Sequence, residues 1–121
     1  MSKSERIGFV GLGIMGQPMS GHLTAAGYEV SVYDIRRESM EIAAERGATP
    51  CASPAEVASL SDVTITMVPD SPDVEAAIAG DGGIVDGVQG GSVVIDMSTI
   101  DPAPGQRLGK QLADKGVLSA Y

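Results

Sequence analysis

Apolar residues along this chain fall into short runs, separated by stretches in which they recur every three or four positions. The short runs predict buried strands, whereas the three- and four-residue spacing predicts helices. Strands are expected at residues 7–10, 30–33, 48–50, 63–68 and 92–97, with one more beginning at 117–118. Helices are expected near 15–26, 35–45, 54–60, 73–79 and from 101 or 102 to about 115, with a Gly-rich loop or short helix over 80–91. Strands that alternate with helices predict an α/β fold, in which a parallel sheet is covered on both faces.

Several predicted helices carry boundary signals. Gly27 and Gly47 follow the last periodic residues of the first two helices and are expected at their C′ positions. Ser53, Pro54 and Glu56 form a capping-box arrangement at the start of the third helix. On the second helix, the positions expected to be buried are Met40, Ile42 and Ala43.

The stretch from Arg6 to Asp34 organises the rest of the chain. Gly11, Gly13 and Gly16 follow the first strand and open the first helix, and Asp34 stands at the end of the second strand. The first glycine permits a tight turn, the second lets a pyrophosphate approach the backbone, and the third lets the helix pack on the strand. Ordinary turn glycines explain one of the three but not their spacing. The pattern predicts a Rossmann-type doubly wound sheet with a dinucleotide at the helix N-terminus and the carboxylate on the adenosine ribose.

Two further segments belong to the same predicted crevice. Ligands of doubly wound sheets bind at the carboxyl ends of the strands, where the strand order reverses. Residues 68–70 and 96–99 follow the predicted fourth and fifth strands. We therefore expect them to line the crevice together with the glycine turn.

Composition narrows the possible partners. The 121 residues fit a single domain, and the net charge of −8 with a pI near 4.4 argues against nucleic-acid and membrane partners, which require basic surface. The lone cysteine, Cys51, suits a reducing compartment, and no apolar run is long enough to span a bilayer, so a cytoplasmic protein is expected. No metal-ligand spacing is present among the carboxylates.

Three stretches together resemble one enzyme family. The sequences G-L-G-I-M-G-Q-P-M, M-V-P-D-S and D-M-S-T-I-D-P are similar to the N-terminal half of the β-hydroxyacid dehydrogenases, which include 3-hydroxyisobutyrate dehydrogenase and tartronate semialdehyde reductase. The resemblance covers residues 6–116 or so, and residues 117–121 begin a further strand that the chain does not complete. The whole chain, 1–121, is thus expected to be one NAD(P)-binding Rossmann domain.

The resemblance implies a role for each matching residue. Ser98 and Thr99 would lie beside the nicotinamide and help to position a small hydroxy-acid substrate. Asp34 favours NAD because it repels a 2′-phosphate, whereas Arg36 and Arg37 offer an alternative that accepts NADP. The residues that would contact the cofactor are Gly11, Leu12, Gly13, Ile14, Met15, Gly16, Asp34, Arg36, Val68, Pro69, Asp73 and Thr99.

The sequence departs from the family where catalysis is concerned. The family's catalytic lysine in a K-x-x-x-N helix, its S-G-G loop and its C-terminal helical domain lie beyond the matched region, and Lys3, Lys110 and Lys115 are poor substitutes. No catalytic residue is therefore expected in this chain, which should bind cofactor with little or no turnover. Two alternatives are a stand-alone nucleotide-binding or regulatory module, and a fragment that forms homo-oligomers through exposed apolar surface.

Overall fold

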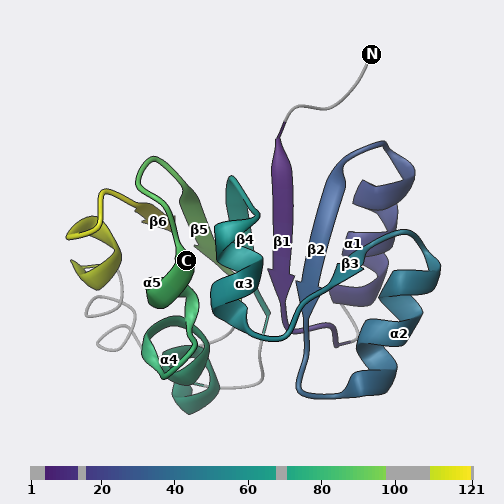
Figure 1. Ribbon diagram of the computed structural model, residues 1–121, viewed down its shortest axis with the longest axis horizontal. Coiled ribbons are helices and arrows are strands. Elements are labelled where there is room, and N and C mark those ends of the chain that lie inside the picture. The colour runs from purple at the N-terminus through teal and green to yellow at the C-terminus, as the bar shows by residue number, and fades with distance from the viewer. Residues whose placement is uncertain (1–4, 14–15, 68–70, 98–109, 121) are drawn as a thin grey trace.

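The computed structural model describes residues 5–13, 16–67, 71–97 and 110–120. Within these residues, six parallel strands form one sheet in the order β3-β2-β1-β4-β5-β6 (Figure 1). The strands are β1 (Arg6–Val10), β2 (Glu29–Tyr33), β3 (Thr49–Pro50), β4 (Val63–Thr66), β5 (Val93–Asp96) and β6 (Leu118–Ala120). The helices are α1 (Gly16–Ala25), α2 (Arg37–Glu45), α3 (Pro54–Ser59), α4 (Ser71–Ala79) and α5 (Ile84–Gly87), and residues 110–113 are also helical.

The strand order reverses between β1 and β4. The chain moves outward from β1 through β2 to β3, then crosses back to place β4 on the other side of β1. Val10 lies level with Tyr33 of β2 and with Thr66 of β4. The carboxyl ends of these three strands therefore meet at one edge, which is the expected ligand-binding edge of a doubly wound sheet. The predicted fold class is confirmed.

Each face of the sheet carries its own hydrophobic core. Successive residues of a strand point to opposite faces, so Phe9 packs in one cluster and Val10 in the other. The Phe9 cluster includes Val32 and receives side chains from α1 and α2, while the Val10 cluster receives Val57 of α3 and side chains of α4 and α5. Burial on both faces also covers the small polar residues that alternate with the apolar ones in β2 and β4, so Ser31, Thr64 and Thr66 are all buried.

The predicted helix boundaries agree with the hydrogen bonding. Gly27 has φ +100°, and the Tyr28 amide donates to the Leu23 carbonyl at 3.1 Å, which is the Schellman ending expected at this glycine. At the start of α3 the Glu56 amide donates to Ser53 Oγ at 3.1 Å. The Glu56 carboxylate, however, accepts from the Ala52 amide at 2.7 Å, one residue earlier than in the standard capping box.

The predicted burial of α2 is wrong at one position. Ala43 is buried and Met40 packs against the core, but the side chain of Ile42 is 45% exposed. Residues two positions apart in a helix differ by about 200° around its axis, so Ile42 faces away from the sheet when Met40 faces toward it. On α1, the fully buried residues are the small Gly16 and Ser20 rather than the larger side chains, which allows a close approach of the helix to the sheet.

Two other predicted boundaries differ from the structure or lie beyond its description. Helix α4 begins at Ser71, two residues before the predicted start at Asp73. The predicted start of the last helix, at Asp101 or Pro102, is outside the described residues. The predicted final strand is present as β6, which pairs with β5.

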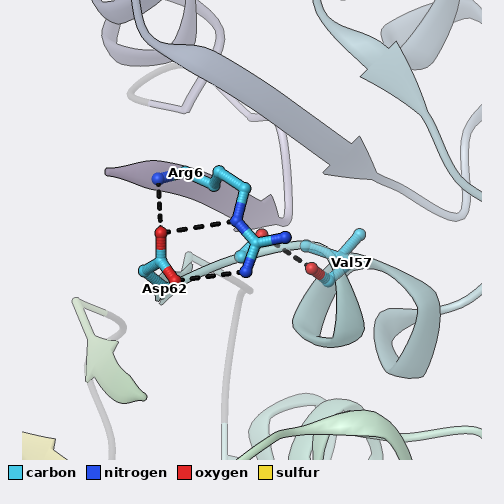
Figure 2. Close-up of polar contacts among 4 residues, drawn as sticks. Arg6, Val57 and Asp62 are labelled. Atoms are coloured by element: carbon cyan, nitrogen blue, oxygen red, sulfur yellow. Dashed lines mark hydrogen bonds and ion pairs between the residues drawn. The ribbon is translucent and has the colours of Figure 1, made fainter. Parts of the chain in front are cut away.

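An ion pair joins β1 and β4 at the amino ends of the strands, opposite the end at which the ligand site is expected. Arg6 at the start of β1 and Asp62 just before β4 face one another, with Arg6 Nη2 3.2 Å from Asp62 Oδ1 (Figure 2). The Arg6 backbone amide also donates to Asp62 Oδ2 at 2.8 Å. The Arg6 guanidinium lowers the pKa of the Asp62 carboxyl through these hydrogen bonds. This contact is structural, because it lies at the amino ends of the strands and away from the reversal of strand order.

No helix in the described ranges is long and apolar enough to cross a membrane.

Candidate functional site

The turn after β1 lies between the ends of two neighbouring strands. The Gly11 amide donates to the Tyr33 carbonyl at the end of β2 (2.9 Å), and the Met67 amide after β4 donates to the Val10 carbonyl (2.9 Å). Gly11 has φ +99°, a left-handed conformation that favours glycine. The hydrogen bonds of the sheet thus fix the beginning of the turn at the place where the strand order reverses.

Gly16 allows the first turn of α1 to approach this loop. A Cβ added at Gly16 would lie 2.6 Å from the Gly11 carbonyl oxygen, which is too close for any real side chain. Gly16 is buried at the beginning of the helix. The third glycine of the motif is therefore required by packing inside the protein.

Gly13 has no comparable structural requirement. It is exposed, its φ is not positive, and a Cβ built on it meets no described atom within 4 Å. The Gly13 carbonyl accepts from the Gln17 amide at 3.1 Å and so leads directly into α1. Within the described residues nothing obstructs an alanine Cβ at Gly13, so the space beside this glycine is available to a ligand.

Asp34 joins the glycine turn to the loop that follows β2. Its Oδ2 accepts from the Leu12 amide at 2.7 Å, and its Oδ1 accepts from the Arg36 amide at 2.8 Å. The carboxylate is half-buried. Its hydrogen bond with the Leu12 amide confirms the prediction that Asp34 and the glycine turn lie together.

A buried polar pair lies beyond the glycine turn, at the ends of β4 and β5. The Thr66 hydroxyl donates to Asp96 Oδ1 at 2.9 Å, and Asp96 is only 7% exposed. The Met97 amide continues the ladder to the Thr66 carbonyl at 2.9 Å. The sequence predicts Asp96 at this edge but not its pairing with Thr66. Two polar residues that end neighbouring apolar strands were the available signal.

Several predicted site residues are outside the described ranges. Asp73 lies in the first half of α4, but its side chain is not described. The remaining predicted residues outside the described part of the chain are Ile14, Met15, Val68, Pro69, Ser98 and Thr99.

Elsewhere in the described residues, the reactive side chains do not form a second catalytic or metal-binding site. Cys51 is buried, and burial together with the nearby Glu56 carboxylate raises the pKa of its thiol to about 11, so it stays protonated and is a poor nucleophile. No group of three or more possible metal ligands occurs in the described part of the chain. A shallow hollow of about 430 Å³ is lined by Pro18, Gly21, His22, Ala25 and Arg46, along α1 rather than at the strand ends.

Comparison with known proteins agrees with this arrangement. The family described as "NAD binding domain of 6-phosphogluconate dehydrogenase" matches residues 6–120. Among curated proteins, the chain is 35% identical to 2-(hydroxymethyl)glutarate dehydrogenase of Eubacterium barkeri, over 97% of this chain and 39% of that protein. It is 38% identical to mouse mitochondrial 3-hydroxyisobutyrate dehydrogenase, over 98% of this chain and 35% of that protein.

The solved structures show the same partial coverage. The 3-hydroxyisobutyrate dehydrogenase of Mycobacterium tuberculosis, determined with L-serine, superposes with a TM-score of 0.84 at 29% identity, over 98% of this chain and 39% of that one. The chain thus spans about two fifths of the length of these relatives.

Proposed function

This chain belongs to the family of the NAD binding domain of 6-phosphogluconate dehydrogenase, and from that premise we propose that it provides the nicotinamide-dinucleotide site of a dehydrogenase that acts on a small 3-hydroxy acid. The bound cofactor would supply hydride transfer between its nicotinamide and the substrate carbon. The chain's own residues would bind and orient that cofactor. The names of the relatives support this substrate class, because both curated relatives are named as dehydrogenases of short hydroxy acids.

The observation that carries the proposal is the open space beside Gly13. Gly11 is explained by its positive φ and Gly16 by its contact with the Gly11 carbonyl. Gly13 is explained by neither, yet it stands at the exposed point of the turn between them. A diphosphate that approaches the backbone at this point accounts for the missing side chain, because a Cβ would keep the phosphate oxygens away from the amides.

The other assignments follow the same edge of the sheet. Asp34 would accept hydrogen bonds from the adenosine ribose, and Arg36 lies beside it at the start of α2. The turn residues Leu12, Ile14 and Met15 would lie along the diphosphate. We assign the adenosine half to Val68, Pro69 and Asp73, and the nicotinamide and substrate to Ser98 and Thr99. The whole chain, residues 1–121, would act as one binding domain.

Asp34 also supports a preference for NAD. A carboxylate at this position repels the 2′-phosphate of NADP, whereas the ribose hydroxyls of NAD can donate to it. The Arg36 guanidinium offers partial compensation for a 2′-phosphate, so binding of NADP is expected to be weaker rather than absent.

The wider biological setting is part of the proposal. Turnover of the hydroxy acid would require the remainder of a full-length dehydrogenase, since no catalytic residue is assigned to this chain. A reducing, cytoplasmic location is supported by the single buried thiol of Cys51. Association with a second copy is supported by exposed apolar side chains, with Met97 49% and Leu118 73% exposed.

Calorimetric titration with NAD tests the proposal on three proteins. We expect binding by the unchanged chain and a loss of at least about tenfold in Gly13→Val, because the valine side chain occupies the space assigned to the diphosphate. Gly90→Val is the matched control. Gly90 is also exposed without positive φ, its added Cβ makes only ordinary contact (3.4 Å to the Lys115 carbonyl), and it lies near the amino end of β5. Circular dichroism should show that both variants are folded. Unchanged NAD affinity in Gly13→Val, or absence of binding by the unchanged chain, would contradict the proposal.

A further inference from the structure

We infer that Asp34 has a second role, as a positioning residue that holds the glycine turn in the shape that receives a diphosphate. This inference rests on the proposed function, and it goes beyond the ribose contact assigned to Asp34 there. It is carried by the two hydrogen bonds of the carboxylate to backbone amides on different loops.

Leu12 stands between the first two glycines of the motif. Its side chain is buried in the Phe9 cluster, and its amide donates to Asp34 Oδ2 at 2.7 Å. Leu12 is therefore held at both its side chain and its backbone. Because Gly13 follows directly and has no side chain to anchor it, the position of the Gly13 peptide depends on how firmly Leu12 is held.

The orientation of the Asp34 carboxylate is set by a second hydrogen bond. Asp34 Oδ1 accepts from the Arg36 amide at 2.8 Å, so the carboxylate is fixed between two backbone donors rather than by one. Arg36 is the N-cap residue of α2 and makes no side-chain cap of its own. The turn after β1 is thereby tied to the start of the helix after β2, although the two hydrogen-bonded residues Leu12 and Asp34 are 22 positions apart.

The Asp34 carboxylate has enough acceptor sites for both roles. Each carboxylate oxygen has two acceptor sites, and each uses one of them for a backbone amide. One acceptor site on each oxygen remains for a ribose hydroxyl. The same group can therefore hold the turn before a ligand arrives and contact the sugar afterwards, which lowers the cost of ordering the turn at the moment of binding.

The two roles predict different responses to a ligand without ribose hydroxyls. We would compare ADP with 2′,3′-dideoxy-ADP on the unchanged 121-residue chain and on Asp34→Ala. If Asp34 acts only on the sugar, the substitution should not affect binding of the dideoxy compound. If Asp34 holds the turn, Asp34→Ala should lower the affinity for the dideoxy compound about tenfold, because one hydrogen bond to a charged group no longer restrains the turn. The affinity for ADP should fall by more, because the contact with the ribose is lost as well.

Two further variants separate the positioning role of Asp34 from the effect of its charge. Glu38→Gln removes one negative charge in the first turn of α2 without touching either backbone amide, and it should leave both affinities unchanged. Asp34→Asn keeps one acceptor oxygen and should recover part of the affinity for the dideoxy compound. Hydrogen exchange at the Leu12 amide, measured without ligand, should be faster in Asp34→Ala and unchanged in Glu38→Gln.

The outcomes distinguish this inference from the function on which it rests. Equal affinity of the unchanged chain and Asp34→Ala for the dideoxy compound would overturn the positioning role alone and leave the nucleotide site in place. Unchanged exchange at the Leu12 amide in Asp34→Ala would do the same. Failure of the unchanged chain to bind either nucleotide would overturn both the positioning role and the proposed function.

Discussion

Replacement of Gly16 by alanine tests whether the glycine turn is packed as tightly as the structure indicates. The added Cβ would lie 2.6 Å from the Gly11 carbonyl oxygen, about 0.8 Å short of the 3.4 Å at which ordinary contact begins. Gly11 cannot easily move away, because its own amide is bonded to the Tyr33 carbonyl at 2.9 Å. The strain must therefore be relieved by a shift of α1 or of the turn.

The expected loss of stability follows from two opposing effects. Overpacking a well-packed region costs about 1–3 kcal/mol. Replacement of glycine by alanine in a helix returns about 0.5–1 kcal/mol, and less at a first helical position such as Gly16. The net free energy of unfolding should fall by roughly 1–2 kcal/mol, which for a chain of this length lowers Tm by roughly 4–8 °C.

Urea unfolding followed by far-ultraviolet circular dichroism is the appropriate assay, because the chain contains no tryptophan for fluorescence. The midpoint should fall in Gly16→Ala with little change in the slope of the transition. Gly13→Ala is the matched control, since its Cβ meets no described atom within 4 Å and its stability should change by less than about 0.5 kcal/mol. A Gly16→Ala protein as stable as Gly13→Ala would refute the close approach of α1 to the turn.

Two further predictions concern the sheet. Thr64 is fully buried and its hydroxyl has no hydrogen-bond partner in the described part of the chain, so Thr64→Val should raise the free energy of unfolding by about 1 kcal/mol. Thr66→Val, which removes an equally buried hydroxyl that donates to Asp96, should lower it by about 1–3 kcal/mol, and effects of the same sign in the two urea titrations would contradict this reading. The third prediction concerns acid. Because folding lowers the pKa of Asp62, its contribution to stability is present above the ordinary aspartate pKa and is lost as the pH falls below it. Asp62→Asn should therefore reduce the difference between the urea midpoints at pH 7 and pH 3, and an undiminished difference would show that the Arg6 pair contributes nothing to acid sensitivity.

Much of the architecture could be predicted because it is determined by neighbours in the sequence. A β-branched run such as Val63–Thr66 favours a strand, and Gly27 and Gly47 end helices because they adopt a positive φ that side chains resist. Ser53 caps α3 through an amide three residues away. These interactions span only a few residues, so a local pattern is sufficient to identify them.

The details of burial were harder to predict. The sequence shows that Ile42 is apolar but not which side of α2 faces the sheet, and the packed structure selects the side that carries Ala43. The paired hydroxyl of Thr66 and the unpaired hydroxyl of Thr64 look alike in the sequence. Their difference arises from β5, which brings Asp96 beside only one of them.

By itself, the sequence determined that a glycine-rich turn joins a strand to a helix and that a carboxylate ends the next strand. Only the tertiary structure decided what each of these residues does. A side chain at Gly16 would collide with the Gly11 carbonyl, whereas one at Gly13 would meet no described atom. Both carboxylate oxygens of Asp34 accept hydrogen bonds from backbone amides. The physical reason is that parallel pairing of β1 with β2 sets two distant loops side by side, and hydrogen bonds between loops depend on that pairing rather than on spacing along the chain.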